Sequence, residues 1–543
     1  MTAEIWEGRG HADPAHVLRA FNAVRRRRRL AAIRWMDLIT DAYGTALAGS
    51  IVLSILIDAF GGLGAPSAGS APPPVTPRIA ALAGALACVV VILGAREGRL
   101  GGPLALEAAH VRHVLWSPID RSRAMRGPLL SVMARRLLIG ALGGAALGLV
   151  IARSSAGPTA LFVAGTAFCG AITSGVGLGV AVLTNRMARP ARLPLAITIA
   201  FLGWSLNDAW RETRSSPVTW LANLAVGPDR TLFVVGPAIA LLLATSVLAL
   251  ARVGGTSIEL AERRAALVSM VRFSVTTQDL RSVIVLRRLL TLEIPRRRPW
   301  FRIDPWAPTA LPAWRRGWHG LLRWPAGRIV RCLVLGAVSG AAAVGAWKGT
   351  NLLLVVAGVA MYLVALDVVE PLAQEDDHPQ LRDLQPIEAT KLAVHLLSAP
   401  VSALFGVALV ALGTSVAFAI RSDHVAATAA LGVLLVAPSA VGAAAGALWS
   451  LMRKPPDLAN PQYLMAPEAF GTALVVHYCV PIILASAGFA PVLIARSESL
   501  RGQSALDAAW AAAPAAIAIT AALAWVLNVI TTAATKKGKR WIV

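Results

Sequence analysis

Apolar segments long enough to cross a lipid bilayer recur along nearly the whole sequence. A bilayer core about 30 Å thick takes roughly 20 consecutive apolar residues per helix. Hydrophobic residues make up 56% of the 543-residue chain and charged residues only 15%, a balance far from that of a soluble domain. The sequence therefore predicts an all-α, polytopic membrane protein without a sizeable soluble domain.

The apolar segments predict about twelve transmembrane helices, divided evenly between two halves of the chain. The predicted spans of the first half are Met36–Phe60, Ile79–Ala95, Leu137–Ala152, Thr159–Thr184, Leu193–Asn207 and Thr231–Ala251. Those of the second half are Cys332–Trp347, Leu352–Val369, Leu392–Ile420, Val425–Leu451, Thr472–Ala495 and Ala505–Ala533. We expect residues 1–252 to form the first membrane half, with an amphipathic helix near Pro14–Trp35, and residues 332–543 to form the second.

Residues 253–331 are predicted to be a basic cytoplasmic linker between the halves. From Gly254 to Arg331 the chain carries 15 arginines and five acidic residues. Ile258–Leu292 has apolar residues at helical spacing. The part from Pro295 to Pro325 is rich in proline and tryptophan, which favours an irregular connector at the lipid headgroups over a nucleic-acid groove.

The distribution of positive charge predicts the topology. With both termini placed in the cytoplasm, 43 of the 52 lysines and arginines fall on the inner side of the plasma membrane, as inner loops require. The nine on the outer side are Arg78, Arg153, Arg211, Arg214, Arg230, Lys348, Arg421, Arg496 and Arg501. Because the net charge of +23 lies in loops between spans, we expect membrane lipids and no nucleic acid as partners.

Two polar loops indicate an internal repeat. Ser117-Pro118-Ile119-Asp120, before the third span, matches Gln385-Pro386-Ile387-Glu388, before the ninth, at an offset of 268 residues. Arg186 and Arg453, which follow the fourth and tenth spans, repeat at 267 residues. Two halves with the same orientation form a parallel repeat, with the transport path predicted between them.

Motifs for chemistry within the chain are absent from the sequence. It contains no GxxxxGK[ST], HExxH or GxSxG motif and no Cys/His cluster, so we expect no catalytic residue, bound cofactor or metal. Ionisable residues in the apolar segments lie near span ends, apart from His477. If the chain uses ATP, hydrolysis has to occur in a separate subunit.

The two matched loops are candidates for docking such a subunit. The first, Arg96–Arg136, has eight arginines and three acidic residues, whereas the second, Glu370–Lys391, has six acidic residues. In each loop a proline is followed two residues later by a carboxylate, which is typical of the first turn of a helix. Trp116 could anchor a partner or, alternatively, lie among the lipid headgroups.

The phrases LWSPIDRSRAMRGPLL and VEPLAQEDDHPQ, together with the duplicated six-span halves, resemble the permease subunit of an ABC exporter in the fused form found in actinobacteria. The resemblance implies short cytoplasmic coupling helices that dock two ATP-binding subunits, which would hold ATP and Mg²⁺. It carries this docking role onto Leu106, Glu107, His110, Trp116, Pro118, Asp120, Asp383, Pro386 and Glu388. The alternatives are an ion-coupled secondary transporter and a membrane scaffold or enzyme.

Overall fold

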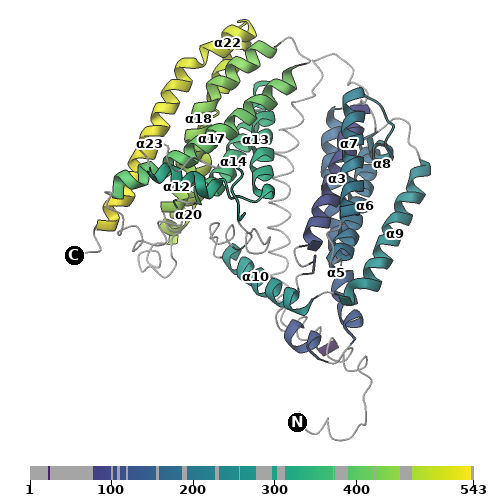
Figure 1. Cartoon of the computed structure of the whole chain (residues 1–543). Helices are drawn as coiled ribbons and strands as arrows, with labels where there is room; N and C mark the ends of the chain where they lie inside the picture. The colour runs from purple at the N-terminus through teal and green to yellow at the C-terminus, as the bar shows by residue number, and fades with distance from the viewer. Residues whose placement is uncertain are drawn as a thin grey trace, which may run out of the picture. The chain divides into compact units, whose positions relative to one another are not determined.

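The computed structural model describes two compact units, Met1–Leu292 and Glu293–Val543. The described residues are 23–24, 77–99, 102–104, 106, 110–117, 120–154, 158–185, 192–226, 232–255, 257–276, 286, 296–301, 312–370, 372, 389–420, 424–452 and 467–539. All regular structure within these residues is helical (Figure 1). The division between the units falls inside the predicted linker, so its first helix belongs to the first unit.

The described helices are those of a polytopic membrane protein in length and composition. Eight of them are long and apolar enough to cross a membrane, and a bent pair gives a ninth if the pair is one span. The predicted first span lies outside the described residues, as does the predicted amphipathic helix at Pro14–Trp35 apart from Ala23 and Val24, which are helical.

The first unit is organised around one central helix. Its elements are α3 (Pro77–Arg99), η1 (Val111–Leu115), α5 (Arg121–Ser154), α6 (Thr159–Asn185), α7 (Arg192–Arg211), α8 (Pro217–Val226), η2 (Leu232–Val234), α9 (Val235–Arg252), η3 (Val253–Gly255) and α10 (Ile258–Thr276). Helix α6 contacts α3, α5, α8 and α9. Half of the residues in the most apolar stretch of α6 are buried, against 6% of those in the corresponding stretch of α5, so α6 is the core helix and α5 is peripheral.

A glycine seam joins α5 to α6. Gly140, Gly144 and Gly148 follow one another at a spacing of four residues and so lie on one face of α5. A Cβ on Gly144 would lie 2.1 Å from the carbonyl oxygen of Thr166, and one on Gly140 would lie 2.4 Å from that of Gly170. The two backbones are therefore in direct contact, the arrangement that small residues permit between membrane helices.

The second unit has a corresponding core helix. Its elements are α12 (Pro312–Leu321), α13 (Ala326–Trp347), α14 (Leu353–Val368), α17 (Ala389–Ala419), α18 (Val425–Met452), α20 (Pro467–Ala487), α21 (Pro491–Leu500), α22 (Ala505–Ala511) and α23 (Ala513–Lys539). Helix α18 contacts α14, α17, α20 and α23, and 56% of the residues in its most apolar stretch are buried. In each unit the core helix thus contacts the two described α-helices that precede it in the chain.

The structure differs from the sequence prediction in four places. Helix α5 begins at Arg121 instead of Leu137, because Met125 and Leu129 form an apolar stripe that is buried while Arg126 between them is exposed. Helix α8 occupies a predicted loop, and α12 lies within Pro295–Pro325, which was predicted to be an irregular connector. The predicted eleventh span is bent by 52° between α20 and α21, next to Pro491, which lacks the amide hydrogen that would donate a helical hydrogen bond.

The turn between α7 and α8 is built on Asp208, whose side chain is fully buried just beyond the predicted span Leu193–Asn207. Its carboxylate accepts five hydrogen bonds, from the hydroxyls of Thr213, Ser215 and Thr219 and from the amides of Ser215 and Ser216. Burial raises the pKa of Asp208, but these hydrogen bonds outweigh it and lower the pKa to about 2. The carboxylate therefore stays ionised and fixes the turn.

Candidate docking site

The loop between α3 and α5 folds onto one end of the first bundle. Its side chains Leu104, Leu106, Val111, Val114 and Leu115 are all buried. They pack in one cluster with Met125 and Leu129 of α5, Leu178 and Val182 of α6, Val253 of η3, and Ala261 and Ala265 of α10. The loop is therefore held by four helices and keeps a defined shape.

The turn η1 has two faces of opposite character. Val111, Val114 and Leu115 are at most 4% exposed, whereas Arg112 and His113 are exposed and Trp116, directly after the turn, is 63% exposed. The buried side chains stand three and four residues apart, which places them on one side of the turn. The opposite side presents a guanidinium, an imidazole and an indole to the surroundings.

Asp120 caps the helix that follows this loop. Its Oδ1 accepts hydrogen bonds from the amide of Ser122 at 3.0 Å and from its hydroxyl at 2.9 Å. The hydroxyl and amide hydrogen bonds of Ser122 lower the pKa of Asp120. A carboxylate at this position stabilises a helix amino terminus, so Asp120 has a structural role whether or not a partner binds.

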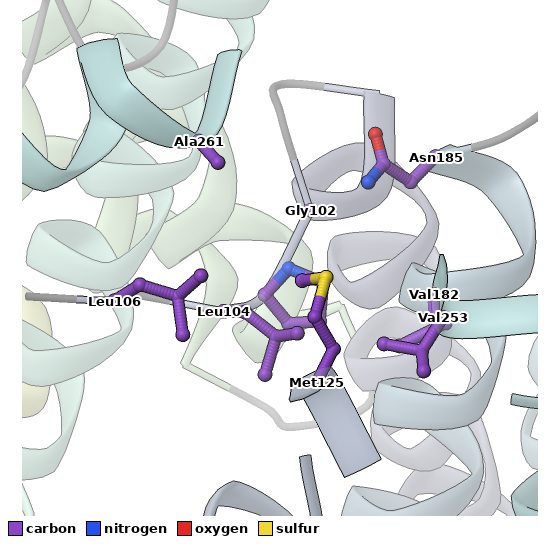
Figure 2. Close-up of a pocket in the computed structure, with 9 residues that line it drawn as sticks. Gly102, Leu104, Leu106, Met125, Val182, Asn185, Val253 and Ala261 are labelled. Carbon is purple, nitrogen blue, oxygen red and sulfur yellow. The ribbon is translucent and has the colours of Figure 1, made fainter. Parts of the chain in front are cut away.

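A small pocket lies beneath the loop (Figure 2). Its lining is mostly apolar and includes Leu104, Leu106 and Met125, with Asn185 at one side. Gly102 adopts a positive φ of 86° there, and a Cβ on it would lie 2.7 Å from the Asn185 amide nitrogen. Glycine is therefore needed for the loop to leave α3 at this point.

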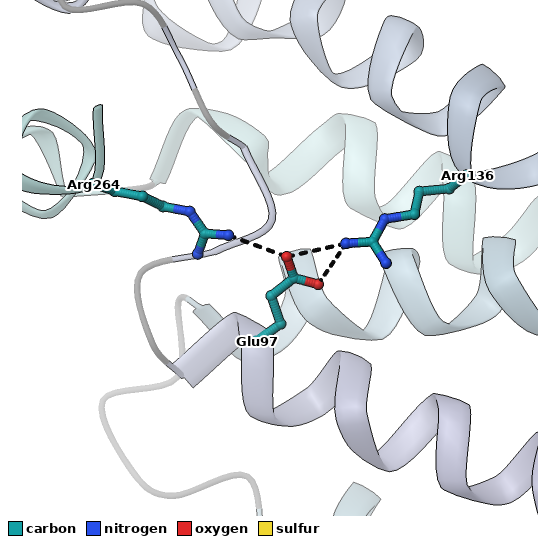
Figure 3. Close-up of polar contacts among 3 residues, drawn as sticks. All are labelled: Glu97, Arg136 and Arg264. Carbon is teal, nitrogen blue, oxygen red and sulfur yellow. Dashed lines mark hydrogen bonds and ion pairs between the residues drawn. The ribbon is translucent and has the colours of Figure 1, made fainter. Parts of the chain in front are cut away.

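Glu97 connects three helices at the same end of the bundle (Figure 3). From α3 its carboxylate accepts hydrogen bonds from Arg136 Nη2 of α5 at 2.8 and 3.1 Å, and from Arg264 Nη2 of α10 at 3.1 Å. The Arg264 side chain is 17% exposed and that of Glu97 28% exposed, so water screens this cluster only in part.

A second ion pair ties α10 to the turn itself. Glu262 Oε1 lies 3.3 Å from Arg112 Nε, and both side chains are exposed, 37% and 68% respectively. Helix α10 is thus attached at two charged points and through the apolar contacts of Ala261 and Ala265. Although α10 belongs to the predicted linker in sequence, it is part of the loop's support in the fold.

The described residues divide the predicted docking side chains into two groups. Leu106 and His110 are buried, so they support the loop and do not face outward. Trp116 and Asp120 are exposed. Glu107, Pro118, Asp383, Pro386 and Glu388 lie outside the described residues.

The flanks of the second loop carry a charged cluster of their own. At the end of α14, Asp367 accepts hydrogen bonds from Arg331 Nε at 2.9 Å and Nη2 at 2.6 Å. Arg328 pairs with Glu370 and also donates to the backbone carbonyl of Asp367. Arginine–carboxylate pairs therefore mark the end of the helix before the loop in both units.

Sequence reasoning did not find the Glu97, Arg136 and Arg264 cluster. Glu97 is separated from its partners by 39 and 167 residues, which no local spacing pattern reveals. The available signal was an acidic residue between Arg96 and Arg99 at the end of an apolar span, where an isolated carboxylate would need partners.

No family model, curated protein or solved structure matches the chain. Among the described residues, no group of three His, Cys, Asp or Glu side chains could hold a metal ion.

Proposed function

We propose that the chain is the membrane-spanning subunit of an ATP-driven exporter. In this proposal it has two parallel repeats of six spans and both termini in the cytoplasm, and it lies in the plasma membrane. It docks two copies of a separate ATP-binding subunit, which hold ATP and Mg²⁺. The single observation that carries the proposal concerns the loop after α3. One side of this loop is buried against neighbouring helices, and the other side presents Arg112, His113 and Trp116.

The arrangement of helices within each unit supports the proposed repeat. Helix α6 contacts α3, α5 and α9, while α18 contacts α14, α17 and α23, which are the corresponding elements at the proposed offset. Helix α3 also contacts α7 as α14 contacts α20. A shared order of neighbours around a shared core helix is expected of duplicated six-span halves.

Export requires that a change in the partner reach the spans. A partner seated on the outward side of η1 would act on a turn that is packed against α5 and α10. Closure of two ATP-binding subunits would then move these helices together and tilt the halves. The chain itself contributes binding and conformational change and no hydrolytic step.

Co-purification tests the proposed partner. The full chain isolated from native membranes should retain a subunit with a GxxxxGK[ST] phosphate loop and Mg²⁺-dependent ATPase activity. Trp116→Ala combined with His113→Ala should reduce the amount retained at least about tenfold, which corresponds to a loss of about 1.4 kcal/mol. Asp120 is not substituted, because its loss would uncap α5.

A matched control separates docking from general effects. Trp210 is 67% exposed, close to the 63% of Trp116, and lies at the predicted outer end of α7. Trp210→Ala should leave the ATPase bound. Equal retention by wild type and the Trp116 variant would remove this loop from the coupling mechanism, and retention of no ATPase by wild type would refute the exporter proposal.

Cysteine labelling in intact cells tests the orientation. A cysteine at Ser499 or Ser70 should react with an impermeant external thiol reagent, whereas one at Ser122 should not. Labelling at Ser122 would reverse the proposed orientation of the first unit.

An ion-coupled transporter is the second candidate, favoured by the Arg331–Asp367 pair and by Arg328, which is 6% exposed. Buried charged groups in membrane bundles often line ion or substrate paths, and these lie at the ends of α13 and α14. Purified chain in vesicles, without any ATPase, discriminates the two: substrate movement driven by an ion gradient supports this candidate and excludes the first.

A further inference from the structure

A basic and aromatic platform precedes α13 in the second unit. It consists of residues 296–301 and 312–325, which contain Arg296, Arg297, Arg298, Arg315, Arg316 and Arg323 together with Trp300, Phe301, Trp314, Trp318 and Trp324. These two stretches contain no acidic residue. The platform is therefore strongly cationic.

Backbone hydrogen bonds hold the two stretches together. The amide of Arg296 donates to the carbonyl of Arg323 at 2.8 Å, and the amide of Trp300 donates to that of Leu322 at 3.0 Å. The Trp300 indole N–H donates to the carbonyl of Trp324 at 2.9 Å. The two described parts of the segment that was predicted to be an irregular connector are thus joined to each other by hydrogen bonds.

Aromatic rings order Arg296 of the platform and Arg328, which follows it in α13. Arg296 Cζ lies 3.7 Å from the centre of the Trp300 ring, and Arg328 Cζ lies 3.9 Å from that of Trp324. Stacked guanidinium groups keep their charge and lose rotational freedom. Trp300 remains 42% exposed and Phe301 74% exposed, so large apolar surface lies beside the exposed charges of Arg296, Arg297 and Arg298.

The fold places the platform at the ends of two candidate membrane spans. Pro325 immediately precedes α13, a candidate span that begins at Ala326. A Cβ on Gly317 of α12 would lie 2.7 Å from Cβ of Ala399 in α17, four residues beyond His395, where the second candidate span begins. At 1.5 Å per residue, this contact lies about 6 Å along α17 from the start of that span.

We propose that this platform binds the headgroups of anionic phospholipids. Arginines at headgroup depth meet phosphate groups, while Trp300 and Phe301 contact the upper acyl region, where tryptophan is favoured. Charge complementarity selects an anionic lipid over a zwitterionic one. This proposal does not depend on transport by the chain or on an ATPase partner.

Lipid titration of the purified full chain tests this site. Phosphatidylglycerol or phosphatidylcholine is added to the protein in neutral detergent, and bound lipid is counted by native mass spectrometry. Wild type should retain phosphatidylglycerol in preference to phosphatidylcholine. The variant Arg296→Gln, Arg297→Gln, Arg298→Gln should bind phosphatidylglycerol at least about tenfold more weakly.

The matched control removes the same charge elsewhere. Arg121, Arg123 and Arg126 are also exposed and stand at the start of α5, and no aromatic ring among the described residues stacks on them. Replacing these three by Gln should leave phosphatidylglycerol affinity unchanged, and an equal loss in both variants would show a net-charge effect and overturn the proposed site. If the first variant fails to fold, it is replaced by the variant Arg296→Lys, Arg297→Lys, Arg298→Lys. This variant should retain most of the phosphatidylglycerol binding, since the positive charge remains. A tenfold loss of binding in the lysine variant would contradict attraction to the headgroups.

Soluble competitors distinguish other ligands. Inorganic phosphate and a short oligonucleotide should each fail to displace phosphatidylglycerol, because neither provides acyl chains for Trp300 and Phe301. Displacement by phosphate would indicate a free-anion site, and displacement by the oligonucleotide a nucleic-acid site. Either result would overturn lipid binding.

Discussion

Two adjacent glycines in α5 should respond in opposite ways to the same substitution. A Cβ on Gly144 would lie 2.1 Å from the Thr166 carbonyl oxygen and 2.8 Å from its carbon, whereas a Cβ on Gly143 has no atom within 4 Å. Gly143→Ala should stabilise the protein by about 0.5–1 kcal/mol, because alanine loses less backbone entropy in a helix. Gly144→Ala has the same entropic gain, but its Cβ and the Thr166 carbonyl oxygen must move apart by more than 1 Å to reach an ordinary contact distance, which separates α5 from α6.

Overpacking of this kind costs about 1–3 kcal/mol, so Gly144→Ala should be destabilising overall by about 1 kcal/mol and should differ from Gly143→Ala by about 2 kcal/mol. The measurement is SDS-induced unfolding of the full chain in mixed micelles, followed by tryptophan fluorescence, with the wild type and both variants in parallel. Free energies of unfolding within about 0.5 kcal/mol of each other would refute the backbone contact between α5 and α6.

Three further results are expected. Glu97→Gln should raise the rate of amide hydrogen exchange in α10 about 30-fold, because a partly exposed ion pair contributes about 2 kcal/mol, a value between those of exposed and buried pairs. The control Glu262→Gln removes a more exposed ion pair and should change this rate little. Equal effects of the two substitutions would contradict the role of Glu97 in holding α10. Asp120→Ala should speed amide hydrogen exchange in the first turn of α5, because the side-chain cap of that turn is lost, and unchanged exchange there would mean that the cap contributes nothing. Because the pKa of Asp208 is lowered to about 2, the stability that its carboxylate contributes should be present above about pH 4 and lost as the pH falls toward about 2. Asp208→Asn should therefore make the turn more sensitive to limited proteolysis than in the wild type at neutral pH but not near pH 2. A difference in proteolysis of the same size at both pH values would exclude this carboxylate as the cause.

The sequence predicted the core helices most accurately. Thr159–Thr184 and Val425–Leu451 agree with α6 and α18 to within one residue at each end, because these helices are apolar on nearly all sides and hydropathy alone defines them. Amphipathic helices were less accessible. The first turns of α5 contain so many arginines that they resembled a loop, although their apolar residues recur at helical spacing.

The candidate site was predicted as a segment but not as a structure. Trp116 was expected to face outward and does, whereas Leu106 and His110 prove to be buried supports. That distinction depends on α10, which reaches the loop from residues about 150 positions away, as the Arg112–Glu262 pair shows. Contacts of that range arise from the tertiary fold and leave no periodic trace in the chain.

The close seam between α5 and α6 has a mechanical consequence. With no side chains between them at Gly140 and Gly144, the two helices have little room to slide, and we expect the pair to turn as one rigid lever. Helix α5 is 34 residues long, or about 50 Å, and Asp120 stands at its very beginning. If the loop transmits the movement of a partner as proposed, a rotation of a few degrees at that end would displace the far end of α5 by several ångströms.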